Sequence, residues 1–293
     1  PSAVIMMISG NHDSAPRVDC FRKVLSRQKV HMIGQPPRTE GESIEKVTLE
    51  DKYGKVNFYL LPFVKPSMVK QVVGTDENGN NLSYNETLHR LIGRENINQD
   101  ERNVLVSHQF YLPVGKKVEE IERMDSEIRT VGNIDEVSAD VLEIFDYAAL
   151  GHLHKAQRVG AEHIRYCGTL LKYSVSEADL EKSLHLVTIG QKKEAVTIEK
   201  FPLHPLRDVQ KVRGCLSGIL SSADPKKRDD YVSVTLTDEI DPYRPKEQLE
   251  KVYSRILEVR TDNERTRKKL EFKDEDIRME NPLETFSDFL VIL

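Results

Sequence analysis

Three short apolar segments of the chain each lead into a small residue that is followed directly by side chains able to bind a metal ion. The segments and their continuations are 3–9 with Gly10-Asn11-His12-Asp13, 104–106 with Ser107-His108-Gln109, and 147–150 with Gly151-His152-Leu153-His154. Short, almost wholly apolar runs of this kind are typical of buried strands. In an open α/β sheet, the loops at the carboxyl ends of the strands form the binding crevice, so we expect the three polar segments to converge on one site.

The residue types in these segments indicate which ligand they would hold. His152 and His154 are two residues apart, so in an extended backbone they point the same way and could offer imidazoles to two neighbouring metal ions. Neutral imidazole and an amide oxygen suit manganese, iron or zinc rather than copper(I) or an iron–sulfur cluster. Taken one at a time, each histidine is more often structural, and that is our interpretation of the remaining five: His31, His89, His163, His185 and His204. The joint pattern predicts a metal centre.

Composition limits the class of protein. The 293 residues are 38% hydrophobic and 31% charged, an ordinary globular composition that is long enough for about two domains. A net charge of −5 does not favour bulk attraction to nucleic acid, and no segment approaches the ~20 apolar residues of a membrane span. Cys20, Cys167 and Cys215 lie far apart, which favours free thiols over a disulfide framework or a zinc knuckle. We therefore expect a cytoplasmic protein without a membrane partner.

Patterning along the chain predicts the elements of a first domain over residues 1–202. The predicted elements are a helix at 15–28, two strands around a turn within 47–63, a helix at 85–94, and further strands at 164–173 and 184–189. Asp13 or Ser14 could cap the first helix.

The residue pattern of the chain changes after Pro202 and Pro205, which mark a linker. The elements predicted beyond it are a strand running into a helix at 209–220, a strand at 231–236, a helix at 246–256 and a strand at 257–259. They predict a smaller α+β domain at 203–265, followed by a tail at 266–293.

The motifs resemble those of a known superfamily. The segment GNHD, a histidine at a later strand end, and GHxH resemble, in this order, the third, fourth and fifth motifs of the calcineurin-like metallophosphoesterases. Other segments resemble the bacterial SbcD family of nuclease subunits: SHQF, FDYAALGHLHKAQ, YCGTLLKYSVSE, LHPLRDVQKVRG and DDYVSVTLTDE. These segments extend over about residues 3–260.

The resemblance implies an α/β fold, a metallophosphoesterase β-sandwich flanked by helices, with residues 203–265 as a DNA-capping domain. It implies two divalent metal ions, with manganese favoured and magnesium, iron or zinc as alternatives. Asn11, His108 and His152 would bind one ion and His154 the other. His12 would be the catalytic histidine that does not bind metal, and Asp13 would support the ligands from behind or cap a helix.

The resemblance also implies an activity and partners. The activity is that of a 3'-5' double-strand exonuclease and single-strand endonuclease. The partners are double- and single-stranded DNA, an SbcC-type coiled-coil ATPase and a second copy of the chain. Residues 280–293 would begin the ATPase-docking segment, or would be an ordinary terminus. The helix at 15–28 would form the dimer interface, or pack on its own sheet. The basic run at 265–269 would contact DNA, or be a solvated helix face, which we favour.

One departure from the family pattern affects the metal site. The family's first two motifs, an Asp-x-His and a Gly-Asp, belong on strands before GNHD, and only ten residues precede Asn11 here. We therefore expect a fragment without its first ~70 residues, an extrapolation from usual element and loop lengths. Such a fragment should bind metal weakly and leave DNA uncut. Two alternatives stay open: a phosphoesterase acting on a nucleotide or phosphoprotein, and a non-catalytic scaffold of the same fold.

Overall fold

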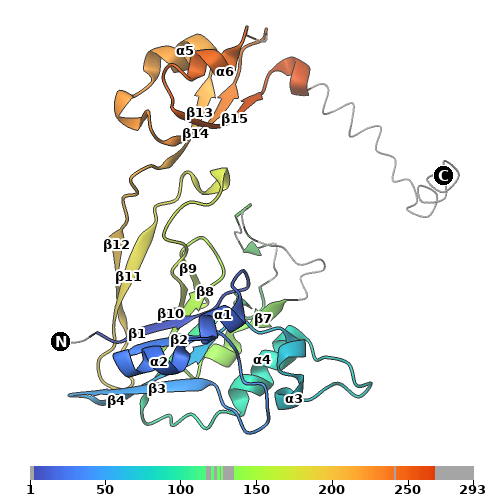
Figure 1. Cartoon of the computed structure of the whole chain (residues 1–293), viewed down its shortest axis with the longest axis vertical. Coiled ribbons are helices and arrows are strands. Elements are labelled where there is room, and N and C mark those ends of the chain that lie inside the picture. The colour runs from blue at the N-terminus through green and yellow to red at the C-terminus, as the bar shows by residue number, and fades with distance from the viewer. Residues whose placement is uncertain are drawn as a thin grey trace, which may run out of the picture. The chain divides into compact units, whose positions relative to one another are not determined.

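A computed structural model describes residues 3–116, 120–121, 124–125, 127, 135–240 and 242–267. The described residues up to His204 form one compact unit, and those from Pro205 onward form a second (Figure 1). The predicted docking segment at 280–293 lies outside the described residues, as do most residues between 117 and 134. No helix among the described residues is long and apolar enough to cross a membrane.

A six-stranded sheet forms the centre of the first unit. In spatial order its strands are β3 (Glu45–Asp51), β4 (Gly54–Leu61), β5 (Arg102–His108), β8 (Tyr147–Gly151), β10 (Ala161–Tyr166) and β9 (Gln157–Val159). The four inner strands run parallel, and β3 and β9 pair antiparallel at the two edges. The hairpin predicted within 47–63 is confirmed as β3 and β4. Because β5 and β8 are parallel neighbours, their carboxyl ends lie side by side.

The first predicted strand is β1 (Ile5–Ile8), which pairs in parallel with β2 (Val30–Ile33). Met6 and Ile8 pack on a cluster of hydrophobic residues that includes Leu60 of β4. Ile5 and Met7 point the other way and are 50% and 48% exposed, so the expectation of a fully buried strand is wrong. Beyond β1, the Phe63 amide donates to the Ser9 carbonyl (3.0 Å), which holds the end of β1 beside the end of β4.

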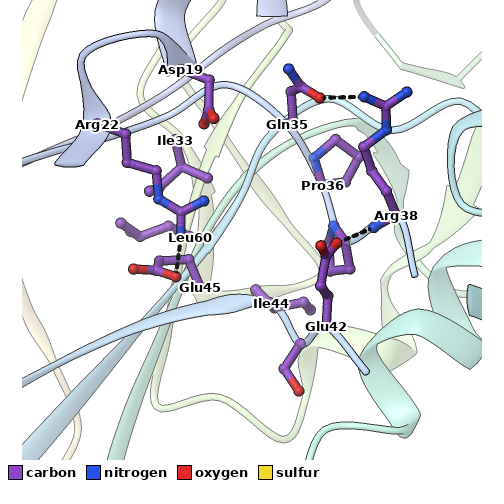
Figure 2. Close-up of a pocket in the computed structure, with 12 residues that line it drawn as sticks. Asp19, Arg22, Ile33, Gln35, Pro36, Arg38, Glu42, Ile44, Glu45 and Leu60 are labelled. Carbon is purple, nitrogen blue, oxygen red and sulfur yellow. Dashed lines mark hydrogen bonds and ion pairs between the residues drawn. The ribbon is translucent and has the colours of Figure 1, made fainter. Parts of the chain in front are cut away.

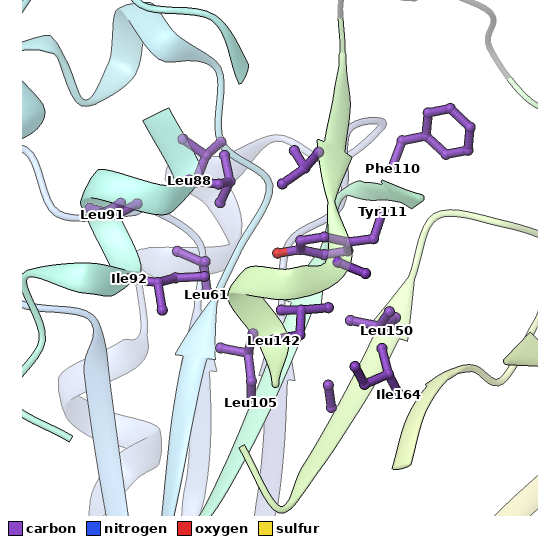
Figure 3. Close-up of a cluster of buried hydrophobic side chains, with 14 of the residues drawn as sticks. Leu61, Leu88, Leu91, Ile92, Leu105, Phe110, Tyr111, Leu142, Leu150 and Ile164 are labelled. Atoms are coloured by element: carbon purple, nitrogen blue, oxygen red, sulfur yellow. The ribbon is translucent and has the colours of Figure 1, made fainter. Parts of the chain in front are cut away.

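The main hydrophobic cluster lies between the central sheet and α4 (Tyr84–Gly93), as Figure 3 shows. Leu88 and Ile92 on α4 pack towards Leu61, Leu105 and other side chains of the sheet. The Ser83 hydroxyl accepts from the Glu86 amide (3.1 Å) and so caps the helix. The helix predicted at 85–94 is confirmed. The smaller neighbouring elements are η2 (Pro66–Met68), α3 (Lys70–Val73), β6 (Phe110–Leu112), β7 (Glu136–Ser138) and η5 (Ala139–Leu142).

Two predicted elements of the first unit differ in the structure. The helix at 15–28 is broken into α1 (Ala15–Asp19), α2 (Arg22–Leu25) and η1 (Ser26–Gln28), because Phe21 leaves helical geometry at φ −103° and ψ 6°. Phe21 is 64% exposed, so this segment does not pack fully on its own sheet. The strand at 164–173 ends at Tyr166, since Gly168 turns the chain with φ +77°. The short η6 (Val175–Glu177) follows, and β11 (Ser183–Thr188) then pairs with β12 (Thr197–Pro202), a strand that the sequence patterning missed.

The second unit is a three-stranded sheet in the order β13 (Val209–Gly214), β14 (Tyr231–Leu236), β15 (Arg255–Thr261), and both pairs are parallel. Parallel neighbours require crossovers, and these contain α5 (Leu216–Ser222), η7 (Pro225–Lys227) and α6 (Pro245–Leu249). Strands and helices therefore alternate, rather than separating as in the expected α+β arrangement. The helix predicted at 246–256 ends early, at Leu249.

Candidate metal site at the strand ends

The structure brings together three of the predicted ligands at the carboxyl ends of β1, β5 and β8. His108 is the last residue of β5 and lies in register with Gly151, the last residue of β8. The His108 Nε2 lies 3.0 Å from the Asn11 Oδ1, which belongs to the loop after β1. The rings of His108 and His152 are 5.5 Å apart and nearly perpendicular, at 86°.

Two glycines make room for the His108 ring. A Cβ added to Gly10 would lie 2.7 Å from His108 Cε1, and one added to Gly151 would lie 2.7 Å from His108 Nδ1. Real side chains do not approach this closely, so any larger residue at either position must displace the ring. Sterics therefore explain why glycine begins both the GNHD and the GHLH segment, because a side chain at either position would collide with the His108 imidazole.

Burial sets the protonation state of His108. Loss of solvent lowers its pKa to about 4; the Asp13 carboxylate opposes this change, while His12 and His154 add to it. The ring is therefore neutral at pH 7, which is the form of imidazole that binds a metal. The electrostatic effects also mean that His12, Asp13 and His154 lie near enough to His108 to influence its charge.

His152 adopts an unusual backbone conformation, with φ of +115°. A residue with a Cβ pays about 1–3 kcal/mol for such a conformation, so the surrounding structure must hold it there. Its ring lies 6.0 Å from that of Phe110 as well as beside His108. The strained turn thus directs the first histidine of GHLH towards the end of β5.

Asp13 closes the turn after β1. Its Oδ2 accepts from the Gly10 amide (2.7 Å), and its own amide donates to the Gly10 carbonyl (3.3 Å). Of the two candidate capping residues, Ser14 stands at the N-cap of α1 and Asp13 does not. The carboxylate instead supports the loop that carries Asn11. His12, between them, is exposed to solvent.

His154 has a different environment from His152. Its Nδ1 lies 3.3 Å from the Oε1 of Glu177, and its ring is 5.7 Å from that of Tyr173. Glu177 and the buried Lys182 that pairs with it were not among the residues predicted from the sequence. The two residues stand five positions apart in the chain and 23 or more from His154, so no local spacing marks them.

Tyr166 is a further residue that the sequence analysis missed. Its fully buried hydroxyl donates to the Gln109 carbonyl (2.7 Å) and accepts from the Tyr111 amide (2.7 Å). It therefore fixes the backbone directly after His108. A strand that includes Tyr166 was predicted from the sequence, but the hydrogen-bond partners of its hydroxyl were not.

The donor chemistry fits a divalent cation, since an amide oxygen and neutral imidazole nitrogens lie at one sheet edge. Within the described part of the chain, no three His, Cys, Asp or Glu side chains group closely enough to hold a metal by themselves. Asn11 and His108 are in direct contact, with His152 beside them. The two-metal arrangement stays a prediction.

A separate hollow of about 450 Å³ lies among α1, α2, β2 and the loop that leads to β3 (Figure 2). An ion pair between Arg22 and Glu45 crosses one side of it, and the Arg38 amide donates to the Glu42 carboxylate (2.6 Å) on the other. None of the six predicted site residues lines it. The predicted site is therefore distinct from this hollow.

These features define a class of protein: an α/β unit with histidines at adjoining strand ends, followed in the chain by a second, small unit. Residues 205–291 match the family model described as the Type 5 capsule protein repressor C-terminal domain, SbcD_C. Over 256 residues the chain is 27% identical to the SbcD subunit of the SbcCD nuclease of Staphylococcus epidermidis, covering 86% of this chain and 64% of that protein. The chain thus spans less than two thirds of that relative's length. Both comparisons support a relationship to the SbcD family.

Proposed function

We propose that the chain contributes the catalytic part of a DNA nuclease of the SbcCD type. The contact between Asn11 Oδ1 and His108 Nε2, with the His152 ring beside it, is the observation that carries this proposal. Similarity to a nuclease subunit over 86% of the chain supports the same conclusion. The reaction would be hydrolysis of phosphodiesters at DNA ends and hairpins.

The residues divide into three roles in this proposal. Asn11, His108 and His152 would hold one divalent ion and His154 a second, with manganese favoured. Bound divalent ions lower the pKa of water and offset the charge that builds on a phosphate. His12 is solvent-exposed in the loop after β1, so it can reach a bound phosphodiester and protonate the leaving oxygen.

The proposed partners are double- and single-stranded DNA, an SbcC-type coiled-coil ATPase and a second copy of the chain. Phe21 lies directly before α2 and Val24 lies within it, and their side chains are 64% and 62% exposed. Two large apolar side chains so close together on a surface favour a protein contact there, which supports a dimer interface.

The full-length gene product, incubated with Mn²⁺ and a hairpin or blunt duplex DNA, tests the proposal. His12→Ala should keep manganese binding and lose DNA cleavage, whereas His108→Ala should lose manganese because a ligand is removed. His204→Ala is the matched control, since His204 is exposed and lies far in sequence from the ends of β1, β5 and β8. Hydrolysis of p-nitrophenyl phosphate without DNA cleavage would favour the phosphoesterase alternative. Normal DNA cleavage by His12→Ala would remove its catalytic role.

A further inference from the structure

We propose that Glu177 is a positioning residue that holds His154 in the tautomer with hydrogen on Nδ1, so that Nε2 is the nitrogen that binds metal. The inference rests on the proposed function in so far as it treats His154 as a metal ligand. The tautomer itself is a property of the chain alone.

Glu177 is well placed for this role because its side chain is fully buried and faces the imidazole. Its Oε1 lies 3.3 Å from His154 Nδ1, and the same oxygen accepts from the Tyr173 amide (3.2 Å) and the Ser174 hydroxyl (3.2 Å). A carboxylate inside a protein needs such donors to offset the loss of solvent. The main chain of the 173–177 turn therefore fixes the position of Oε1.

Lys182 forms a buried ion pair with Glu177. The side chain of Lys182 is 6% exposed, and its Nζ donates to Glu177 Oε2 (2.6 Å), Thr169 Oγ1 (2.9 Å) and the His154 carbonyl (2.9 Å). An ammonium group has three hydrogens, and each of these has an acceptor here. The Glu177 carboxylate is the counter-ion of this buried ammonium group.

An ionised carboxylate can only accept hydrogen bonds. The nitrogen of His154 that faces Glu177 must therefore carry the hydrogen, and in a neutral imidazole this leaves the lone pair on Nε2. Histidines that bind metals commonly donate their other ring N–H to a carboxylate, which orients the ring and raises its basicity.

The same residues also hold the backbone of His154. Lys182 binds its carbonyl, and Glu127 Oε1 accepts from its amide (2.6 Å). A Cβ on Gly168 would lie 2.7 Å from the His154 carbonyl oxygen, so the turn after β10 packs directly on this residue. One buried network thus sets both the ring orientation and the backbone position of His154. Lys182 connects the two, because it contacts both Glu177 and the His154 carbonyl.

The test is the tautomer of His154, read by ¹⁵N–¹H correlation spectra of the metal-free full-length protein. We expect the Nδ1–H form in the wild type and a mixture of both tautomers in Glu177→Gln, because a side-chain amide can donate as well as accept. Manganese affinity, measured by calorimetry, should fall by about 10- to 100-fold. Glu127→Gln is the matched control: it changes the group that faces the His154 amide and should leave the ring tautomer unchanged.

Glu177→Gln leaves the buried Lys182 without its counter-ion, so Glu177→Gln/Lys182→Met provides a neutral pair if the single variant does not fold. An Nε2–H tautomer in the wild type would overturn the inference, as would an unchanged tautomer and manganese affinity in the Glu177 variant that folds. Failure of the protein to cut DNA would contradict the proposed function alone, because the tautomer is measured without metal or substrate.

Discussion

Substituting Gly10 by alanine should both destabilise the chain and displace His108. The added Cβ would sit 2.7 Å from His108 Cε1, whereas carbon atoms in contact prefer about 3.5–4.0 Å. The ring must therefore retreat by about 1 Å. Overpacking of this kind costs about 1–3 kcal/mol. The shift also lengthens the 3.0 Å hydrogen bond between His108 Nε2 and Asn11 Oδ1, whose loss adds about 0.5–1.5 kcal/mol.

The total expected loss is about 1.5–4.5 kcal/mol in the free energy of unfolding, measured by urea titration. Gly151→Ala should behave similarly, since its Cβ meets the same ring from the side of β8. Gly93→Ala is the control, because nothing lies within 4 Å of a Cβ there and alanine is the better residue at the end of α4. If Gly10→Ala matched the wild type in stability and in the ring resonances of His108, the packing argument would be refuted.

Two further variants test the scaffold of the two units. Tyr166→Phe should lower the free energy of unfolding, measured in urea, by about 2–4 kcal/mol, because two buried main-chain groups after His108 lose their hydroxyl partner. A loss below ~0.5 kcal/mol would mean that these groups find other partners. The Arg267 and Arg213 guanidinium groups hold the pKa of Asp262 at about 2, below its usual 3.8. A lowered carboxyl pKa stabilises the fold above pH ~3.8, and this contribution is lost as pH falls through about 2. Asp262→Asn should therefore be less stable than the wild type at pH 5 and equal to it below pH 2, and a gap independent of pH would contradict this.

The strands that end at the candidate site were predictable because their signal is local. A short apolar run followed by glycine or serine and then a ligand residue lies within one stretch of about ten residues, and β5 and β8 form where that pattern occurs. The helix α4 was predictable for the same reason, since its cap and its apolar positions are contiguous. The match of β14 to residues 231–236 follows from strict alternation.

Other features escaped prediction because they depend on partners distant in sequence. The carboxylate behind His154 comes from a turn 23 residues later, and its counter-ion comes from five residues beyond that turn. The strand β12 has weak patterning of its own and forms through pairing with β11. The interruption at Phe21 breaks a helix whose apolar spacing is regular, because this segment buries too little to hold helical geometry throughout.

The sequence by itself determined the types of candidate ligand residue, their order along the chain and the strands that carry them, since each depends on a few adjacent residues. Only the tertiary structure decided that His108 lies between Gly10 and Gly151, that Asn11 meets it, and that His154 is held by Glu177. These contacts join residues that are tens of positions apart, and they follow from the order of strands in the sheet. That order depends on how all the apolar faces pack together, which no single segment specifies.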